Sequence, residues 1–340
     1  PNPGILDSPH NDQNPAAAAV AIQGTAQVLR DLRGKLTERE FKALLGVGPS
    51  LGFAIDTTGS MGSVIAGVRG SATAIVNARL GTENEPSKYV LTPFNDPSVG
   101  PTTVTSDANL FKTRIASLFA SGGGDCPELS MSGMFQAADA SDEGGDVFLF
   151  TDASAKDAGL VGSVSSLATS KKLRMFFSLF GSCSPYDPAY FTLANNSGGQ
   201  VFILARSEAG TVTQLSDLLS RNDSVDIEAA QGVLPAGSPR EHVFAVDSQT
   251  SRLTVSFSSI DSTTLNLFRP DGTEVLPGAP GVTTINLSKG RVYSISPLPV
   301  GQWKARVGGS GEYSLLVAGQ SPLALDEFRY VELGGRPGHQ

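Results

Sequence analysis

The stretch SLGFAIDTTGSMGSVI, residues 50–65, decides the fold of this chain. A short apolar run ends at Asp56, and Thr58 and Ser60 follow at every second position before an apolar helical rhythm begins at Met61. This pattern predicts a buried strand that leads through an oxygen-rich loop into a helix. Asp, Thr and Ser also favour helix N-caps, so the stretch taken alone is typical of a simple capping turn as well.

Around this stretch, residues 49–222 alternate apolar strands with helices. Strands are predicted at LGFAI, KYVLTPF, DVFLF, KLRMFFSLF and GQVFIL. Helical patterns lie between them, over 61–76, 109–120, 129–138, 157–170 and 208–219. Strands that are apolar throughout are buried on both faces, as in a mostly parallel sheet covered by helices. We therefore predict an α/β domain with a doubly wound sheet, whose ligands bind beyond the carboxyl ends of the strands.

The flanking segments have a different character. Residues 1–48 are predicted to form an extended arm followed by helices. From residue 223 to 322, short alternating runs separated by Asp-Gly, Lys-Gly and Gly-Ser turns predict an antiparallel, Ig/fibronectin-like β-sandwich with Trp303 in its core. Residues 323–340 read as a linker or the start of a further module.

Composition limits the classes of function. The chain has 340 residues and a net charge of −8, which disfavours nucleic acid as a partner. No apolar run approaches the roughly 18 residues that a membrane span needs. The chain begins at Pro1 rather than Met, which is typical of a trimmed product, and carries three glycosylation sequons, at Asn195, Asn222 and Asn286. These features favour a secreted or surface-exposed protein.

Two further loops carry acidic residues at predicted strand ends. SGGGDCPELS offers Asp125 and Glu128, and Asp152 follows the apolar run VFLFT. With the first loop, the predicted metal ligands are Asp56, Thr58, Ser60, Glu128 and Asp152. Hard oxygen ligands of this kind suit Mg²⁺, Mn²⁺ or Ca²⁺ rather than zinc. The plainer alternative is that Asp125 and Glu128 only favour the start of the helix that follows. Between these loops, Asp142, Glu143 and Asp146 read as a solvated loop.

These motifs carry a family resemblance. DTTGSM resembles the Asp-x-Ser/Thr-x-Ser motif that opens the metal-ion-dependent adhesion site of von Willebrand factor A domains. GGDCPE is similar to the Asp-x-Pro-Glu loop in the A-like domain of integrin β chains, and FTDAS resembles the segment that supplies the last acidic residue. The motifs occur in the family's order within residues 49–222. With its flanking segments, the whole chain is most similar to hemicentin-like extracellular A-domain proteins.

The resemblance implies a role for each residue of the site. Thr58 and Ser60 would bind a Mg²⁺, Mn²⁺ or Ca²⁺ ion through their hydroxyls, and Glu128 through its carboxylate. Asp56 and Asp152 would act mostly through water. The resemblance also implies an open metal position, which an Asp or Glu of a protein partner, or of a neighbouring copy of the chain, would complete.

The sequence departs from the family pattern at the positions of two further metals. Gly62 and Ser63 stand where acidic residues would hold an adjacent regulatory ion, so we expect none there. A second calcium site can be drawn from Asp96, Asp125 and Glu128. Gly123 replaces the Asn that this second site would require.

In the A-domain arrangement, the two cysteines of the chain lie on the metal-bearing edge of the sheet. A Cys126–Cys183 disulfide would close a loop of more than fifty residues, worth roughly 4 kcal/mol in the entropic description. The alternative is a pair of buried thiols.

The predicted function is a metal-dependent extracellular protein-binding or adhesion module without catalytic residues. One alternative is a structural extracellular module whose metal only stabilises the fold. Another is a phosphatase, because a strand that ends in Asp also opens enzymes with an aspartyl-phosphate intermediate. Those enzymes need a second carboxylate two residues later, where Thr58 stands. The three histidines, His10, His242 and His339, all lie outside residues 49–222.

Overall fold

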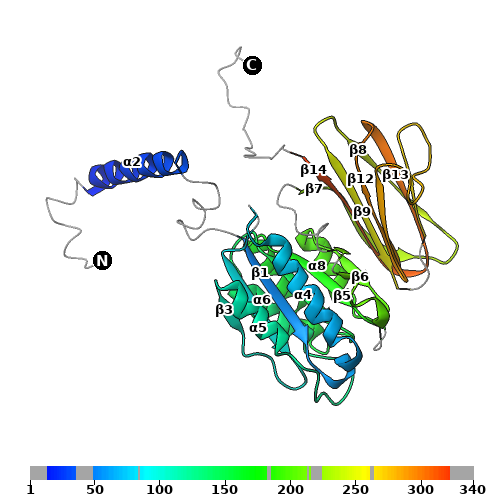
Figure 1. The fold of residues 1–340 in the computed structure, drawn as a ribbon, viewed down its shortest axis with the longest axis horizontal. Coiled ribbons are helices and arrows are strands. Elements are labelled where there is room, and N and C mark those ends of the chain that lie inside the picture. The colour runs from blue at the N-terminus through cyan, green and yellow to red at the C-terminus, as the bar shows by residue number, and fades with distance from the viewer. Residues whose placement is uncertain are drawn as a thin grey trace, which may run out of the picture.

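The computed structural model describes residues 14–35, 49–82, 85–181, 185–212, 214–215, 224–260 and 264–321. A separate helix, α2 (Asn14–Arg33), precedes two units (Figure 1). The first unit is a mostly parallel sheet with helices on both faces, and the second consists of two antiparallel sheets. The predicted doubly wound α/β fold and the all-β sandwich that follows it are both confirmed.

The sheet of the first unit has the strand order β3-β2-β1-β4-β5-β6. Its parallel strands are β1 (Ser50–Asp56), β2 (Lys88–Phe94), β4 (Asp146–Thr151), β5 (Arg174–Leu179) and β6 (Val201–Ile203). The edge strand β3 (Thr103–Thr105) is antiparallel to β2 and was not predicted, because its three residues are not buried and leave no apolar run to detect.

Five α-helices and three short 3₁₀ helices are described in this unit. They are η2 (Gly59–Ser63), α4 (Ile65–Arg79), α5 (Ala108–Ala116), α6 (Ser130–Ala140), η3 (Ala158–Leu160), α7 (Val161–Ser170), α8 (Ala189–Ser197) and η4 (Arg206–Glu208). Helix α5 ends four residues earlier than predicted. Helix α8 was missed: it has nine residues and stops at Gly198, whose φ of 67° is unfavourable for residues with a side chain. The helix predicted over 208–219 begins with η4, and residues 216–219 lie outside the described chain.

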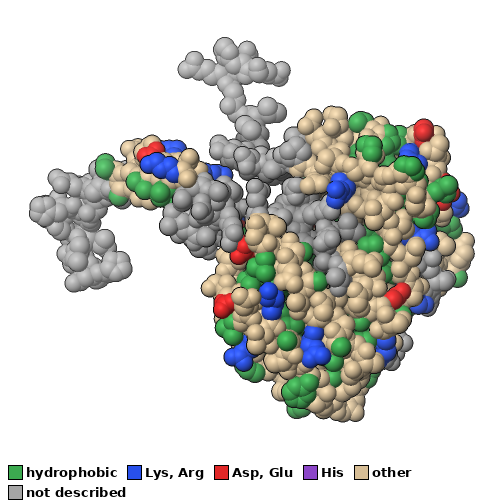
Figure 2. Space-filling view, in the orientation of Figure 1, with side chains coloured by type: hydrophobic (Ala, Val, Ile, Leu, Met, Phe, Trp, Pro, Cys, Tyr) green, Lys and Arg blue, Asp and Glu red, His purple; other side chains and the backbone are tan. Residues whose placement is uncertain are grey.

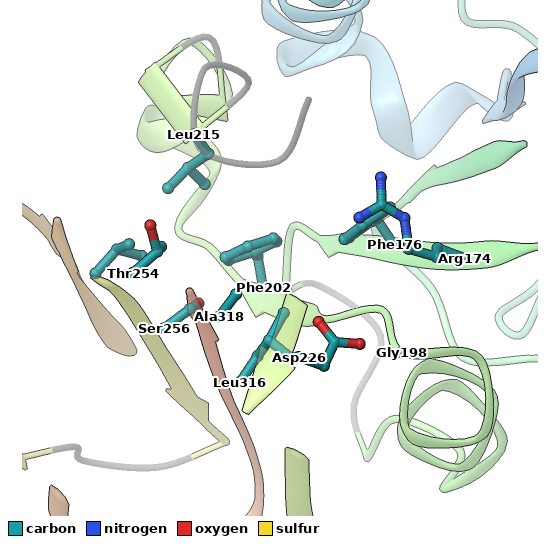
Figure 3. Close-up of a pocket in the computed structure, with 11 residues that line it drawn as sticks. Arg174, Phe176, Gly198, Phe202, Leu215, Asp226, Thr254, Ser256, Leu316 and Ala318 are labelled. Carbon is teal, nitrogen blue, oxygen red and sulfur yellow. The ribbon is translucent and has the colours of Figure 1, made fainter. Parts of the chain in front are cut away.

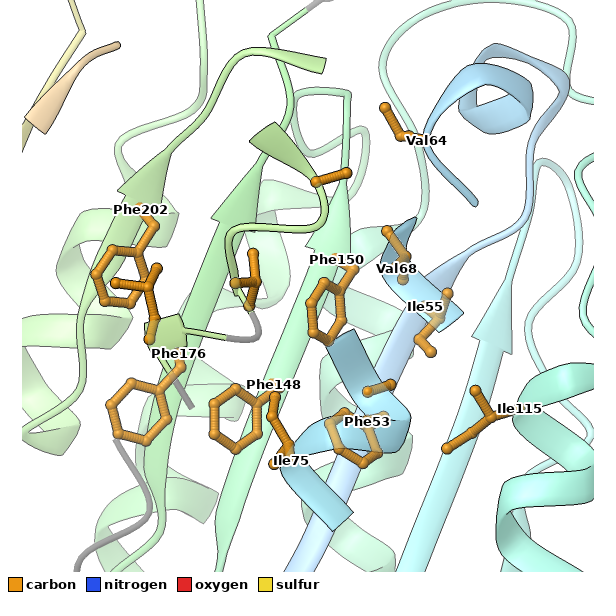
Figure 4. Close-up of a cluster of buried hydrophobic side chains, with 14 of the residues drawn as sticks. Phe53, Ile55, Val64, Val68, Ile75, Ile115, Phe148, Phe150, Phe176 and Phe202 are labelled. Atoms are coloured by element: carbon orange, nitrogen blue, oxygen red, sulfur yellow. The ribbon is translucent and has the colours of Figure 1, made fainter. Parts of the chain in front are cut away.

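Each central strand is apolar throughout because both of its faces are covered. Alternate residues of β4 point to opposite sides, so Phe148 and Phe150 join one core while Val147 and Leu149 join the other. The phenylalanine core lies beneath α4 and α5, and Figure 4 shows its rings side by side along the sheet. Helices α6, α7 and α8 cover the opposite face. Both cores hold the strand ends, and thereby the loops beyond them, in fixed positions.

The amino end of β4 corrects one prediction. Asp146 is 3% exposed and does not belong to a solvated loop. Its carboxylate binds the guanidinium groups of Arg79, at 2.5 Å, and Arg174, at 2.8 Å. These two cations hold the pKa of Asp146 below its ordinary value despite burial.

The second unit is a sandwich of a five-stranded and a three-stranded sheet, with the orders β11-β12-β9-β14-β7 and β10-β13-β8. Its strands are β7 (Ser224–Leu234), β8 (Arg240–Val246), β9 (Arg252–Ser259), β10 (Thr264–Phe268), β11 (Val282–Leu287), β12 (Gly290–Ile295), β13 (Gly301–Gly308) and β14 (Gly311–Gln320). Trp303 is fully buried in the core, as predicted, and its indole nitrogen donates to the carbonyl of Pro299.

The two units pack against each other at β5 and β6, on the face of the sheet opposite to helix α8. Ile285, Leu287 and Val292 of the sandwich join the same core as Phe176 and Phe202. A cavity of ≈ 30 Å³ lies at this junction, between β5 and β6 of the first unit and β9 and β14 of the sandwich. Figure 3 shows side chains that line it, among them Phe176, Phe202 and Leu316. A space of this size holds about one water molecule.

Helix α2 carries its apolar side chains on the surface. Val20 and Ile22 are each 69% exposed, and Figure 2 shows hydrophobic and basic side chains together on this helix. Within the described residues, no helix is long and apolar enough to span a membrane.

Candidate metal centre

The first strand delivers Asp56 to the carboxyl end of the sheet, fully buried. One carboxylate oxygen, Oδ1, accepts hydrogen bonds from the backbone N–H and the hydroxyl of Thr58, at 2.9 and 2.7 Å. The other oxygen, Oδ2, accepts from the hydroxyl of Thr151, at 2.6 Å. Asp56 is therefore fixed through both oxygens, and it orients the hydroxyl of Thr58.

Ser60 is oriented in the same way from the neighbouring strand. Its hydroxyl donates to Oδ1 of Asp152 at 2.9 Å, while the Thr58 hydroxyl donates to Asp56. Both hydroxyl protons are thus used in hydrogen bonds to carboxylates. The hydroxyl oxygens of Thr58 and Ser60 lie 3.0 Å apart and present lone pairs to the space between them. Two adjacent ligands of an octahedral Mg²⁺ ion, each at about 2.1 Å from the metal, are about 3.0 Å apart. The spacing of the hydroxyl pair thus fits a shared cation.

Glu128 reaches the same place from the loop between α5 and α6. It is 3% exposed, and its backbone is held by hydrogen bonds to Ser154 and Lys156, at 2.9 and 2.7 Å. Its carboxylate oxygen Oε2 is buried without a hydrogen-bond partner. A buried carboxylate oxygen without a donor costs free energy, which a bound cation would offset.

These side chains border an open cavity of ≈ 350 Å³, lined by Thr58, Ser60, Glu128, Ala153 and residues 122–126. Gly123 approaches so closely that a Cβ atom there would lie 3.0 Å from Cβ of Thr58. The φ of Gly123 is 73°, a conformation that glycine adopts readily. The residue that departs from the family pattern therefore makes room for Thr58.

The carboxylates of this cluster carry more negative charge than the local structure neutralises. Burial, and then repulsion from Asp56, Asp96 and Asp152, raises the pKa of Glu128 to about 7. Burial raises the pKa of Asp56 to about 6, although hydrogen bonds from Thr151 and Thr58 oppose the shift. Both shifts show that Asp56 and Glu128 lack a cation close enough to offset their burial.

The predicted residues Asp56, Thr58, Ser60, Glu128 and Asp152 thus meet at one edge of the sheet, and we call them the oxygen cluster. Among the described residues, no group of three or more His, Cys, Asp or Glu side chains is placed to hold a metal. A cation here would therefore depend on the two hydroxyls as well as on the carboxylates. That donor set suits a hard divalent ion such as Mg²⁺, Mn²⁺ or Ca²⁺.

The structure disfavours the second calcium site expected from Asp96 and Asp125. The ammonium group of Lys156 lies between them, 2.5 Å from Oδ2 of Asp96 and 3.1 Å from Oδ1 of Asp125. Its hydrogen bond and charge lower the pKa of Asp125. A calcium ion bound by both carboxylates would have to displace the ammonium group of Lys156.

Three residues of this region were not predicted from the sequence. Thr151 orients Asp56, and Arg206 forms an ion pair with Asp152. Lys156 forms ion pairs with Asp96 and Asp125. Thr151 and Lys156 lie within a few residues of Asp152, so inspection of its loop could have found them. Arg206 follows β6, 54 residues after Asp152, and no motif marks it.

The remaining predictions concern covalent modification. Cys126 is disulfide-bonded, and Cys183 lies outside the described residues, so their pairing stays a prediction. Asn195 and Asn286 are exposed, whereas Asn222 lies outside the described residues.

The fold and the oxygen cluster define residues 50–206 as a von Willebrand factor A domain. The model of that family, described as "von Willebrand factor A domain", matches these residues. A second family model, "Hemicentin galactose-binding domain-like", matches residues 227–322. That description differs from the Ig/fibronectin-like sandwich predicted from strand spacing. Residues 50–206 thus belong to the von Willebrand factor A domain family, and the two matches together make the chain similar to hemicentin-like proteins.

Two relatives found by sequence agree with this assignment. The chain is 32% identical to von Willebrand factor A domain-containing protein 7 of Rattus norvegicus, over 93% of this chain and 37% of the relative. It is 28% identical to hemicentin-1 of Mus musculus, over 81% of this chain and 5% of the relative. Among solved structures, a von Willebrand factor type A protein from Catenulispora acidiphila has a TM-score of 0.40 at 12% identity, covering 79% of this chain and 57% of that one. The chain spans less than two fifths of the rat protein's length.

Proposed function

We propose that residues 50–206 form a protein-binding module that depends on a divalent cation, and that it acts outside the cell. Thr58, Ser60 and Glu128 would hold the cation directly, with Asp56 and Asp152 behind them. The unpartnered, buried oxygen of Glu128 beside the paired hydroxyls is the observation that carries this proposal. Bound there, the cation would supply a Lewis-acidic position open to the ≈ 350 Å³ cavity.

The chemistry of the cavity favours a carboxylate as the group that completes this site. A divalent ion attracts a further carboxylate at short range, because hard cations take about six or more oxygen ligands. The net charge of −8 opposes an acidic partner at long range but is screened beyond about 8–10 Å at physiological salt. The proposed ligand is therefore an exposed Asp or Glu of a partner protein or of a second copy of this chain.

The geometry does not favour a phosphatase. Asp56 is fully buried, and both of its oxygens accept hydrogen bonds from Thr58 and Thr151. A nucleophilic carboxylate must instead present a free oxygen to its substrate. We infer a binding role without catalysis.

Immobilised peptides that differ only in one central residue, Asp, Glu, Asn or Gln, test this proposal. The chain should bind the Asp and Glu peptides in Mg²⁺, and EDTA or Thr58→Ala should abolish this binding. Metal-induced stabilisation without selective binding of acidic peptides would favour the alternative, a structural module with a fold-stabilising metal. Equal binding of all four peptides in EDTA would contradict the proposal.

A further inference from the structure

A built-in cation, the guanidinium of Arg206, contacts the oxygen cluster from outside its three motifs. Its Nη2 pairs with Oδ2 of Asp152, whose Oδ1 orients Ser60. Both terminal nitrogens also donate to the carbonyl of Ser60, at 2.9 and 2.8 Å, and Nη1 donates to the hydroxyl of Ser63 at 2.6 Å. Arg206 thus binds the loop that carries one predicted metal ligand and the carboxylate that orients it.

Arg206 is part of the short helix η4, and hydrogen bonds from both units fix this helix in place. The Glu208 carboxylate accepts from the backbone N–H of Ala205 at 2.7 Å, and from the backbone and hydroxyl of Ser288 in the sandwich, at 2.7 and 2.8 Å. The carbonyl of Ala209 accepts from Ser71 of helix α4 at 2.8 Å. The guanidinium is therefore anchored next to the cluster rather than free to swing into solvent.

The charge of Arg206 changes the net charge of the site. Asp56, Glu128 and Asp152 together carry three negative charges when a cation is bound. A divalent ion alone would leave one negative charge, whereas the ion together with Arg206 leaves the site neutral. A neutral site attracts a carboxylate more strongly than a negative one, but the guanidinium also repels the ion itself.

We propose that Arg206 is a positioning and charge-setting residue that weakens binding of the divalent ion while strengthening binding of the partner's carboxylate. This inference rests on the proposed function and deepens it. It predicts changes of opposite sign in two affinities when the charge is removed. A general loss of structure at the site would weaken both.

The test compares Arg206→Gln and Arg206→Met with Arg206→Lys, using Arg306→Gln as the matched control. Arg306 is an exposed arginine on β13, so its substitution removes the same charge away from the cluster. Calorimetric titration with Mn²⁺ measures the metal affinity. N-acetylaspartate, added to the Mn²⁺-loaded chain, serves as the carboxylate probe, and the water-proton relaxation rate reports displacement of water from the metal.

Neutral variants should bind Mn²⁺ roughly tenfold more tightly and N-acetylaspartate roughly tenfold more weakly. Arg206→Lys and Arg306→Gln should stay within about threefold of wild type in both measurements. If the two affinities of the neutral variants changed in the same direction, the inference about Arg206 would be overturned while the proposed function would stand. Absence of Mn²⁺ or N-acetylaspartate binding to the wild type would instead overturn the proposed function. If neither neutral variant folds, the test depends on Arg206→Lys, which keeps the charge. A change of more than tenfold in either affinity of folded Arg206→Lys would overturn the role of charge.

Discussion

Replacement of Glu128 by Gln tests whether the oxygen cluster is destabilising without a cation. At pH 8 the wild-type side chain is ionised, although burial and neighbouring carboxylates raise its pKa from the ordinary 4.5 to about 7. A shift of this size corresponds to roughly 3 kcal/mol of destabilisation in the folded state. The substitution removes this charge but leaves a buried amide without a partner, at a cost of about 1–2 kcal/mol. Glu128→Gln should therefore be about 1–2 kcal/mol more stable than wild type in EDTA.

Addition of Mg²⁺ should reverse this order of stability. At a concentration of one hundred times its dissociation constant, a ligand that binds only the folded state stabilises it by about 2.7 kcal/mol. Wild type should gain this amount and Glu128→Gln should gain little, because the predicted carboxylate ligand is gone. Urea unfolding at pH 8, with and without Mg²⁺, measures both effects.

The control for this experiment is Glu241→Gln, at an exposed glutamate paired with Lys304 on the sandwich. It should change the free energy of unfolding by less than about 1 kcal/mol under either condition. If Glu128→Gln were less stable than wild type in EDTA, and if Mg²⁺ stabilised the variant as much as it stabilised wild type, the account of Glu128 as a metal ligand would be refuted.

Three other outcomes concern the buried charges and the cysteines. In EDTA the chain should gain stability as the pH falls from 8 to 5, because the raised pKa values of Asp56, about 6, and Glu128, about 7, make the folded state bind more protons than the unfolded one. Saturating Mg²⁺ should flatten this slope in urea titrations, since the metal keeps both groups ionised in the folded state and the unfolded carboxyls, with ordinary pKa values of about 4, are ionised over the same range; equal slopes would contradict the assignment. Asp146→Asn should lower the free energy of unfolding by about 3–5 kcal/mol, because it leaves the buried guanidinium of Arg79 without its carboxylate. A loss below about 1 kcal/mol would count against that interpretation. Non-reducing mass spectrometry should find Cys126 linked to Cys183, and two free thiols would exclude the disulfide.

The sequence predicted the architecture well where burial leaves a continuous pattern. Strands β1 and β4 are apolar on both faces because helices cover both sides, and that pattern needs no tertiary information to detect. The same pattern located Asp56 and Asp152, since each follows such a run. Parallel strands then bring their carboxyl ends to one edge, which is why ligands more than 90 residues apart could be grouped.

What could not be predicted depends on contacts between distant segments. In the sequence, Arg206 looks like any surface arginine. It becomes part of the site only because the fold places η4 next to the loop that follows β1. Asp146 resembled a loop residue because its partners, Arg79 and Arg174, come from a distant helix and the next strand. Lys156 lies close to Asp152 in the sequence, but its pairing with Asp96 and Asp125 of other loops could not be predicted. Charge pairing of this kind leaves no periodicity in a single sequence.

The most direct test of the central claim is a crystal structure of the chain soaked in Mn²⁺, with anomalous diffraction measured to locate the ion. We predict one anomalous peak at the oxygen cluster, within about 2.0–2.6 Å of the hydroxyl oxygens of Thr58 and Ser60 and a carboxylate oxygen of Glu128. A peak between Asp96 and Asp125 instead, or no peak at the cluster under saturating Mn²⁺, would contradict the claim that these residues form a metal-dependent binding site.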